Sequence, residues 1–260
     1  MPELPESDQA RRVIEEQCLN RTIESAELGS DTGYIDLPGD NERGRLIGRQ
    51  FTETTRHGKY IFAGSKTGPW IVVHLGMSGK LVAFDAPDDP PDYTKFLIAF
   101  EGDRRLAFRC PRKLGSLTVI DDPESFIADK KLGPDALKIT CEEFTEAIGS
   151  SRGAVKSALI SQTKLAGVGN LWSDEVLYRT GILPDRDGTD LSEAKLAEMH
   201  GALQDILRQV LKVHAVYSEL PNDWLIHGRK IGADCSLCSG SIVKQTIGGR
   251  SAYHCDTHQE

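Results

Sequence analysis

The sequence predicts an α+β fold, in which a β-rich N-terminal region precedes a helical region and a small cysteine-bearing hairpin. Short runs of β-branched and aromatic residues, broken by Gly, Pro and Asp, fill the first half of the chain. Segments with apolar residues at helical spacing fill most of the second half. The end of the chain, from about Gly232, is rich in Gly and Cys. With 260 residues and 39% hydrophobic residues, the chain is long enough for one or two cores.

The N-terminal region begins with a predicted helix over residues 6–18. Apolar residues from Ala10 to Cys18 recur at the spacing of a single helix face. From residue 22 to residue 120 the pattern predicts strands, and the segment 85–92 (DAPDDPPD) is expected to be a loop. The clearest strands are expected at 60–63, 70–75, 80–84, 96–100, 105–108 and 116–120.

The helical region follows a change of composition near residues 121–134. Helices are expected at 141–148, 154–161, 171–179 and 192–213. The last of these has apolar side chains along one face, which is typical of a helix packed on a core. We therefore expect three domains, at 1–125, 126–225 and 226–260.

The apolar runs and the cysteines narrow the class of protein. The longest apolar runs are short, such as WIVV at 70–73, and this excludes a membrane-spanning helix. The N-terminus has neither the basic nor the apolar segment of a secretory signal peptide. Six cysteines without such a signal favour free thiols or a metal site in a reducing compartment over a disulfide framework.

The formal net charge of −8, taken alone, argues against binding to nucleic acid. The charge is unevenly distributed, however. Segments 149–182 and 226–258 each hold four Lys or Arg against two Asp or Glu, a net of +2 each, which leaves −12 on the remainder. An acidic body with two basic segments can still bind phosphate.

The C-terminal segment carries a metal-binding pattern, C-x2-C followed by C-x2-H. Its candidate ligands are Cys235, Cys238, Cys255 and His258. Four such ligands complete a tetrahedral zinc site with no open position, so we expect one structural zinc ion. The alternative is four incidental residues in a reduced protein. The insert 239–254 is predicted to be a hairpin with its turn at Gly248 and Gly249.

Two further positions are candidates for chemistry. Pro2 becomes a terminal secondary amine if Met1 is removed, and an α-amino group titrates near pH ~7.7–8, so much of it is nucleophilic at neutral pH. Glu3 beside it could act as a general acid or base. The alternative is an ordinary start of a chain. Arg250 follows the hairpin turn and is either a functional cation or a solvated surface residue.

Several separated motifs carry a family resemblance. They are MPELPE at 1–6, RHGKY at 56–60, HLGMSG at 74–79, PRKLG at 111–115, LGP at 132–134 and GVGN at 167–170, followed by the cysteine-bearing hairpin. In this order they closely resemble the formamidopyrimidine-DNA glycosylase / endonuclease VIII family from end to end. The ELPE start and HLGMSG are more similar to the formamidopyrimidine branch.

The resemblance implies a fold and an activity. The fold is an N-terminal β-sandwich with an N-terminal helix, then a helical domain with a helix–two-turns–helix, and a β-hairpin zinc finger. The activity is that of a bifunctional DNA glycosylase/AP lyase of base excision repair, which acts on oxidised or ring-opened bases by β,δ-elimination and needs no organic cofactor. Implied catalytic residues are Pro2 as the Schiff-base nucleophile, Glu3 as the acid for sugar-ring opening, Lys59 in the RHGKY strand, and Arg250 at a flanking phosphate.

The resemblance also implies a set of DNA contacts. These are His74, Met77, Arg112, Leu114, Lys156 and Asn170. Met77, Arg112 and Leu114 match the family's positions that fill the space left by a flipped base. The alternatives are a buried strand histidine for His74 and ordinary core for Met77 and Leu114. We expect a monomer that binds damaged double-stranded DNA, without a membrane, in the cytoplasm of a bacterial or archaeal cell at the nucleoid.

The sequence departs from the family pattern at several points. His258 replaces a cysteine, Cys110 and Leu114 stand where Asp and Phe are common, and PPDYTKF lacks a DNA-contacting His often found near there. The segment 213–227, between the long helix and a strand expected at HGRK (227–230), is shorter than the family's loop that covers flipped 8-oxoguanine. The shorter segment favours a substrate preference for oxidised pyrimidines, ring-opened purines or bulkier lesions. A non-catalytic protein that binds lesions or abasic sites, and a zinc-dependent RNA or protein adaptor, are the competing interpretations.

Overall fold

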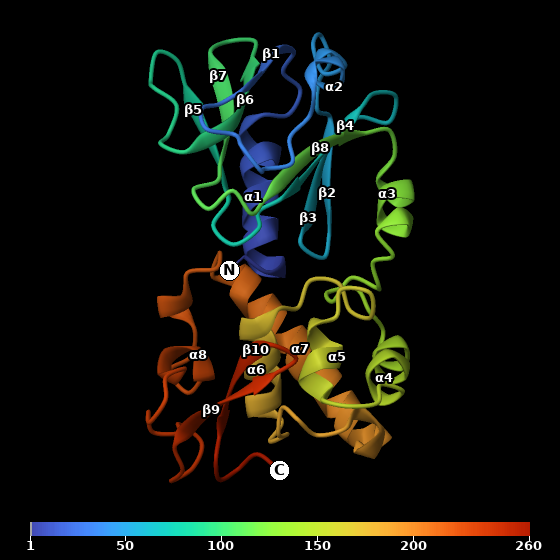
Figure 1. The fold of residues 1–260 in the computed structure, drawn as a ribbon, viewed down its shortest axis with the longest axis vertical. Coiled ribbons are helices and arrows are strands. Elements are labelled where there is room, and N and C mark those ends of the chain that lie inside the picture. Colours follow the sequence, from blue (N-terminus) through green and yellow to red (C-terminus); the bar gives the residue numbers. More distant parts are fainter. Residues whose placement is uncertain (1) are drawn as a thin grey trace. The chain divides into compact units, whose positions relative to one another are not determined.

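The computed structural model describes residues 2–260, and these residues form two compact units, divided between Lys130 and Lys131. The first unit consists of sheets beside one long helix, and the second of helices with a small hairpin (Figure 1). No helix in the described part of the chain is long and apolar enough to cross a bilayer. The predicted division into 1–125, 126–225 and 226–260 stays a prediction.

The first unit contains two antiparallel four-stranded sheets within residues 2–130. Their strand orders are β1-β6-β7-β5 and β2-β3-β4-β8. The strands are β1 (Ile23–Leu28), β2 (Glu53–His57), β3 (Tyr60–Gly64), β4 (Trp70–His74), β5 (Lys80–Asp85), β6 (Thr94–Phe100), β7 (Arg104–Arg109) and β8 (Ser116–Ile120). The helices are α1 (Leu4–Gln17), α2 (Asp40–Gly44) and α3 (Pro123–Asp129).

A single apolar core lies between the two sheets. Ile61 and Val73 come to it from one sheet, Phe96 and Phe108 from the other, and Ile14 from α1. Successive side chains of a strand point to opposite faces, so each sheet turns alternate residues to this core. The arrangement confirms the predicted β-sandwich with its N-terminal helix. That helix begins at Leu4, two residues before the predicted start.

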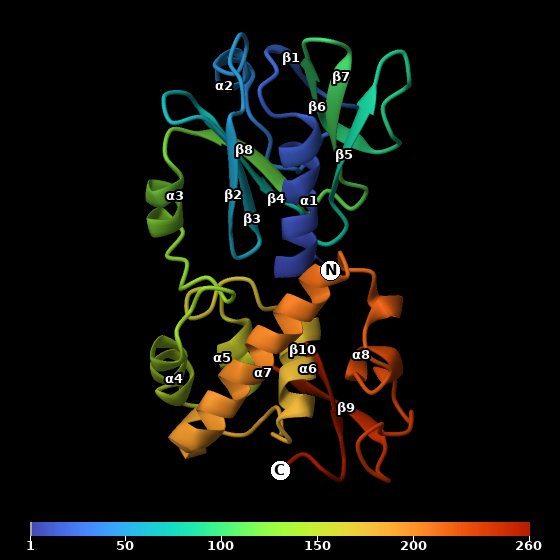
Figure 2. The same ribbon diagram turned by 180° about the vertical axis from the view of Figure 1, so that it is seen from behind.

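The second unit is built around α6, which packs against α5, α7, α8 and the hairpin strand β10. Figure 2 shows α6 beside this hairpin from the side opposite to Figure 1. The helices are α4 (Cys141–Gly149), α5 (Val155–Ile160), α6 (Asn170–Arg179), α7 (Glu193–Lys212) and α8 (Leu225–Gly228), with short 3-10 turns η1 (Gly188–Asp190) and η2 (Tyr217–Glu219). The hairpin strands are β9 (Ile242–Ile247) and β10 (Arg250–Cys255).

The helix–two-turns–helix and the hairpin that the sequence predicts for this unit are both present. The helices α5 and α6 flank the GVGN motif as a helix–two-turns–helix. The hairpin turns at Gly248 and Gly249, whose φ angles of +54° and +74° suit glycine in a tight two-residue turn. The apolar face expected on the longest helix is buried along α7.

Two local predictions are wrong. Lys59 was expected within a strand, but it lies in the two-residue turn between β2 and β3, where Gly58 has a φ of +56°. The segment 227–230 was expected to be a strand, but it holds the end of α8 and the turn that follows. In both cases a local turn or cap outweighs the β-propensity of the neighbouring residues.

The cap of α8 is the buried carboxylate of Glu175 in α6. Its two oxygens accept hydrogen bonds from the backbone amides of Leu225 at 3.1 Å and Ile226 at 3.0 Å. These amides belong to the first turn of α8, so the carboxylate satisfies donors that the helix itself leaves unpaired. Burial nevertheless raises the pKa of Glu175 to about 7, against the effect of these amides.

Because of this one carboxyl group, the free energy of unfolding should fall as the pH rises. The folded-state pKa of about 7 lies above the ordinary 4.5, so the folded chain holds the proton more tightly. The resulting stabilisation is complete below pH 4.5 and is lost as the pH rises through 7. Its size is about 3 kcal/mol at ~1.4 kcal/mol per pKa unit. Chemical denaturation of the wild type and Glu175→Gln at pH 5 to 8 measures it.

The expected result is a free energy of unfolding that falls less steeply with pH in Glu175→Gln than in the wild type. The control, Glu219→Gln, changes an exposed carboxylate and should keep the wild-type slope. Identical slopes in the wild type and Glu175→Gln would show that Glu175 stays ionised in the folded chain.

Candidate functional site

The start of α1 holds the two N-terminal candidates. Pro2 is partly exposed, whereas Glu3 is 1% exposed and stands as the N-cap residue of α1. The amide of Glu3 donates to Glu6 Oε2 at 2.7 Å, and its carbonyl accepts from the amide of Ser7 at 3.1 Å. The backbone beside Pro2 is thus fixed, while Pro2 stays accessible.

Lys59 is fastened to the same end of α1. Ser7 of α1 donates its hydroxyl to the carbonyl of Lys59 at 3.3 Å. On the other side of the turn, the buried Arg56 donates to the carbonyl of Gly58 at 2.8 Å. Two side chains therefore fix the turn that carries Lys59, although that residue is in a turn and not in a strand.

His74 is the last residue of β4 and is half-buried. It pairs across the sheet with Tyr60, and the two rings lie 4.9 Å apart. Burial, with the Lys59 ammonium as a second cause, lowers the pKa of His74 to about 4, so the ring is neutral at pH 7. The amide of Gly76 donates to Nδ1 at 3.3 Å, which assigns the ring proton to Nε2. That N–H can donate to an anionic oxygen.

The three residues expected to fill the space of a flipped base lie on two touching loops. Met77 and Leu114 are 39% and 54% exposed, and Arg112 is exposed, so none of them belongs to the core. The amide of Arg112 donates to Ser78 Oγ at 3.3 Å, which joins the loops. A Cβ at Gly76 would lie 2.1 Å from the carbonyl oxygen of Leu114. This close backbone approach brings two apolar wedges and a cation to one surface of the first unit.

The loop between α5 and α6 is held by Gln162. Its amide nitrogen donates to the carbonyls of Ile160 and Val168 at 2.8 and 2.7 Å, and its oxygen accepts from the amide of Gly167 at 3.0 Å. Gly167 has a φ of +114°, which only glycine adopts at low cost. The loop delivers Asn170 to the first position of α6, where anions are favoured.

Lys156, which the resemblance places near DNA, has a side chain that is 0% exposed. Its ammonium donates to the carbonyl of Asn170 at 3.3 Å and to Ser173 Oγ at 3.1 Å, and it forms an ion pair with Asp174. Arg250, by contrast, is exposed at the first position of β10, directly after the hairpin turn.

The four predicted metal ligands converge. Their ligand atoms all lie within 4.8 Å of one another, at Cys235, Cys238, Cys255 and His258. His258 Nδ1 is 3.4 Å from Cys235 Sγ, and the sulfurs of Cys238 and Cys255 are 3.4 Å apart. The group could hold one metal ion.

Groups around this cluster fix the ligands. His258 Nε2 donates to the carbonyl of Tyr178 at 2.9 Å, which leaves Nδ1 as the free donor atom for a metal. The amides of Leu237, Gly240 and Thr257 point at the three sulfurs at 3.4, 3.2 and 3.4 Å. Amides that point at sulfur stabilise thiolates, which are the metal-binding form.

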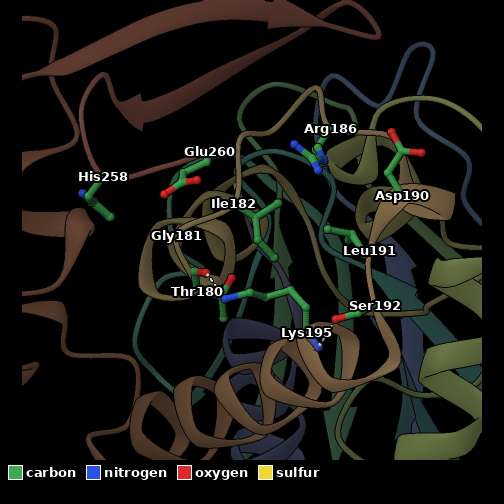
Figure 3. A pocket seen from close by; sticks show the side chains of 10 residues that line it. All are labelled: Thr180, Gly181, Ile182, Arg186, Asp190, Leu191, Ser192, Lys195, His258 and Glu260. Carbon is green, nitrogen blue, oxygen red and sulfur yellow. Dashed lines mark hydrogen bonds between the residues drawn. The ribbon is translucent and has the colours of Figure 1, made fainter.

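A pocket of about 450 Å³ lies beside His258 in the second unit (Figure 3). It carries charges of both signs, from Arg186 and Lys195 and from Asp190 and Glu260. Lys195 donates to the carbonyl of Thr180 at 3.1 Å. Among the candidate site residues, the pocket is lined by the metal-ligand candidate His258 and by none of the candidate catalytic or DNA-binding residues.

Sequence reasoning did not single out the residues that fix these loops. Ser7, Arg56 and Gln162 act on partners in other turns or elements, and no short-range pattern records such contacts. For Arg56 the RHGKY motif was the only signal. Pro2, Glu3, Lys59, His74 and the two loops belong to the first unit, whereas Asn170, Arg250 and the metal ligands belong to the second.

Comparisons with known proteins agree along the chain. The profile of the formamidopyrimidine-DNA glycosylase N-terminal domain matches residues 1–117, and that of the formamidopyrimidine-DNA glycosylase H2TH domain matches residues 132–221. A formamidopyrimidine-DNA glycosylase of Geobacter metallireducens is 30% identical over 98% of both chains. One of Acidothermus cellulolyticus is 30% identical over 100% of this chain and 97% of its own.

Solved structures give the same result. The formamidopyrimidine-DNA glycosylase of Lactococcus lactis, bound non-covalently to DNA with an AP site, superimposes with a TM-score of 0.87 at 25% identity over 99% of both chains. MutM in complex with DNA containing carbocyclic 8-oxo-G superimposes with a TM-score of 0.87 at 26% identity over the full length of both chains.

The close approach of the two loops gives a test of their packing. We expect Gly76→Ala to cost about 1–3 kcal/mol of stability, because the new Cβ meets the carbonyl of Leu114 and the φ of +61° is strained for alanine. Denaturant unfolding measures the cost. Gly33→Ala, where the new Cβ meets nothing within 4 Å, should stay within about 0.5 kcal/mol of the wild type. Equal stability of both variants would contradict the packing of the loops.

Proposed function

The chain belongs to the formamidopyrimidine-DNA glycosylase family, and on that premise we propose that it removes oxidised or ring-opened bases from double-stranded DNA and then nicks the strand as an AP lyase. The observation that carries this proposal is the start of α1. There an accessible Pro2 adjoins the buried Glu3, and Ser7 fastens the turn of Lys59 to the same helix. The amine supplies the nucleophile of Schiff-base chemistry, and the neighbouring carboxyl group and lysine can transfer the protons that it moves.

The proposed reaction begins at Pro2 after removal of Met1, which lies outside the described residues. The secondary amine attacks C1′ of the damaged nucleotide, and the damaged base leaves with a proton as the C1′–N bond breaks. Glu3 donates a proton to O4′, so that the sugar ring opens and an iminium forms at C1′. The iminium acidifies the C2′ proton. Its removal expels the 3′ phosphate, and loss of a further proton expels the 5′ phosphate.

Other residues are proposed to bind and orient the DNA. Lys59 transfers a proton or holds the lesion-side phosphate, and Arg250 neutralises a flanking phosphate during elimination. His74 offers Nε2–H to a phosphate oxygen, since its Nδ1 is already an acceptor. Asn170 presents its side-chain amide at the first turn of α6.

The flipped base leaves a space in the duplex that two exposed apolar side chains can fill. Met77 and Leu114 suit this role because they stand out from touching loops, and Arg112 beside them can hydrogen-bond the orphaned partner base. Without such side chains, nothing replaces the stacking contacts of the flipped base, and the free energy of DNA binding alone must offset their loss.

The packing of the segment after α7 favours a wider choice of lesion. Tyr217 of η2 packs edge-on against Trp172 of α6 at 5.6 Å, and Trp224 does so at 6.4 Å. This short segment is thus held down on α6 by aromatic contacts. We propose that it does not close over a flipped 8-oxoguanine as the longer family loop does. The same chemistry then extends to oxidised pyrimidines or bulkier lesions.

Zinc is proposed as the metal of the cysteine–histidine group, as one structural ion. Ligands around a tetrahedral zinc ion, with Zn–S ~2.3 Å and Zn–N ~2.0 Å, lie about 3.5–3.8 Å apart, close to the separations found here. Three thiolates and one imidazole leave no open position for a substrate. Such an ion would stabilise the β9–β10 hairpin that carries Arg250. A monomer in the bacterial or archaeal cytoplasm is the proposed setting.

The nucleophile is tested by borohydride trapping on denaturing gels. We expect the wild type to form a covalent complex with a duplex that carries an abasic site, and Pro2→Gly to lose at least about 90% of it, because amine catalysis depends on a positioned nucleophile. Mass spectrometry of the trapped peptide should place the adduct on a chain without Met1. An adduct on Lys59 would contradict the mechanism.

A parallel duplex with 8-oxoguanine opposite cytosine separates the remaining interpretations. A trapped band on the abasic duplex alone would keep the lyase chemistry and assign the base preference to other lesions. Tight binding to the abasic duplex without trapping or cleavage would favour a non-catalytic lesion-binding protein. Equal affinity for damaged and undamaged duplex would favour an adaptor.

The metal is tested by elemental analysis of the purified protein. We expect about one zinc ion per chain, lost in Cys235→Ser, with a less stable hairpin and weaker DNA binding as a result. Cys141→Ser, which changes an exposed cysteine outside the group, should retain the metal. Iron in place of zinc, or a metal-free protein with full DNA affinity, would overturn the assignment.

A further inference from the structure

A buried ion cluster in the second unit has no place in the chemistry described so far. Asp174, in the middle of α6, is 0% exposed. Lys156 of α5 forms an ion pair with its Oδ1. Arg229, directly after α8, donates to Oδ2 through Nε at 3.0 Å and Nη2 at 2.6 Å. The backbone amide of Tyr253 in β10 donates to the same oxygen at 3.2 Å.

The same two cations hold the first residue of α6. The carbonyl of Asn170 accepts from Lys156 Nζ at 3.3 Å and from Arg229 Nη2 at 3.4 Å. The guanidinium of Arg229 also lies over the ring of Tyr253, 4.4 Å from its centre. Three charged side chains therefore tie the start of α6 to a strand of the hairpin.

The tip of the hairpin is held separately. A Cβ on Gly248 would lie 3.1 Å from the hydroxyl of Ser157 in α5, so the turn rests closely on that helix. Ser157 is the neighbour of Lys156 in the chain. Arg250 thus stands between two fixed points of the hairpin, the turn at Gly248 and the amide of Tyr253.

We propose that Asp174, Lys156 and Arg229 are positioning residues, which fix β10, and with it Arg250, in register with Asn170. The two cations act on DNA through these partners and contact no phosphate themselves. The inference rests on the proposed function, since it assumes that Asn170 and Arg250 bind DNA.

Charge and burial support an indirect role. Turning either cation to a phosphate would leave the carboxylate of Asp174 buried with one partner fewer, which is costly. Lys156 has no exposed side-chain surface from which to reach a phosphate. Arg229 already uses two of its nitrogens on Asp174.

The salt dependence of binding distinguishes positioning from phosphate contact. Each lost phosphate contact lowers the slope of log K against log salt by about 0.9. A residue that positions Arg250 removes only the contact of Arg250, so its change in slope equals that of Arg250→Met and does not add to it. The probe is a labelled duplex with an uncleavable tetrahydrofuran abasic site, measured by fluorescence anisotropy over a range of KCl concentrations.

For Arg229→Met we expect the Kd to rise about ten- to hundredfold, with a slope lowered by about 0.9 as in Arg250→Met, because the phosphate contact of Arg250 is lost. Its control is Lys230→Met, the same charge change at the next residue, which is exposed and outside the cluster. This control should show less than about a threefold change in Kd. A slope lowered by about 1.8 in the double variant Arg229→Met/Arg250→Met, or a wild-type Kd in Arg229→Met, would overturn the proposal.

A double-mutant cycle keeps the test independent of folding losses. Arg250→Met should weaken binding strongly in the wild type but much less in the Arg229→Met background, because the hairpin is then already out of register. Additive losses would overturn the proposal, since a merely destabilised fold predicts additivity. If the wild type itself does not bind the abasic duplex, the proposed function fails, and not the cluster alone.

Discussion

The second unit depends on one constraint, the need to satisfy a row of polar side chains that α6 buries. The carboxylate of Asp174 accepts from the amide of Tyr253 in the hairpin, and that of Glu175 accepts from the amide of Leu225 in α8. The hydroxyl of Tyr178 accepts from the amide of Ser236, beside the candidate ligand Cys235. Buried polar groups are costly without partners, so each of them specifies where a neighbouring element must lie. A single ten-residue helix thereby positions the hairpin, the short helix and the metal ligands.

The first unit solves a similar problem with backbone contacts. Lys59 and the residues of the two touching loops stand on turns, and turns hold a fixed geometry only when something outside them binds their carbonyls and amides. The hydroxyl of Ser7 does this for Lys59, and the close approach of Gly76 to Leu114 does it for the two wedge loops. Rigid sheets alone would not place these side chains.

Features with a periodic or spaced signature could be predicted from the sequence. The helix expected at 192–213 and the hairpin turn at Gly248 and Gly249 are confirmed. The four predicted metal ligands lie together in a group that could hold a metal ion. Lys156 shows where such reasoning stops. A lysine in a basic segment suggests an exposed cation, yet its counter-charge Asp174 lies 18 residues away on another helix and draws it into the interior. For residues 227–230 the deciding contact was likewise distant, at Glu175.

The aromatic packing on α6 has an optical consequence. Trp172 and Trp224 meet edge to face, and the guanidinium of Arg179 lies over Trp224 at 5.1 Å. Trp172 belongs to α6, the helix that holds the hairpin, and Trp224 belongs to the segment packed on α6. Indole emission responds to nearby charge and to solvent, so it will change when the hairpin loses its order. Trp70, in the apolar cluster of β3 and β4, supplies a steady background in the same spectrum. The chain therefore contains its own fluorescent reporter of order in the hairpin.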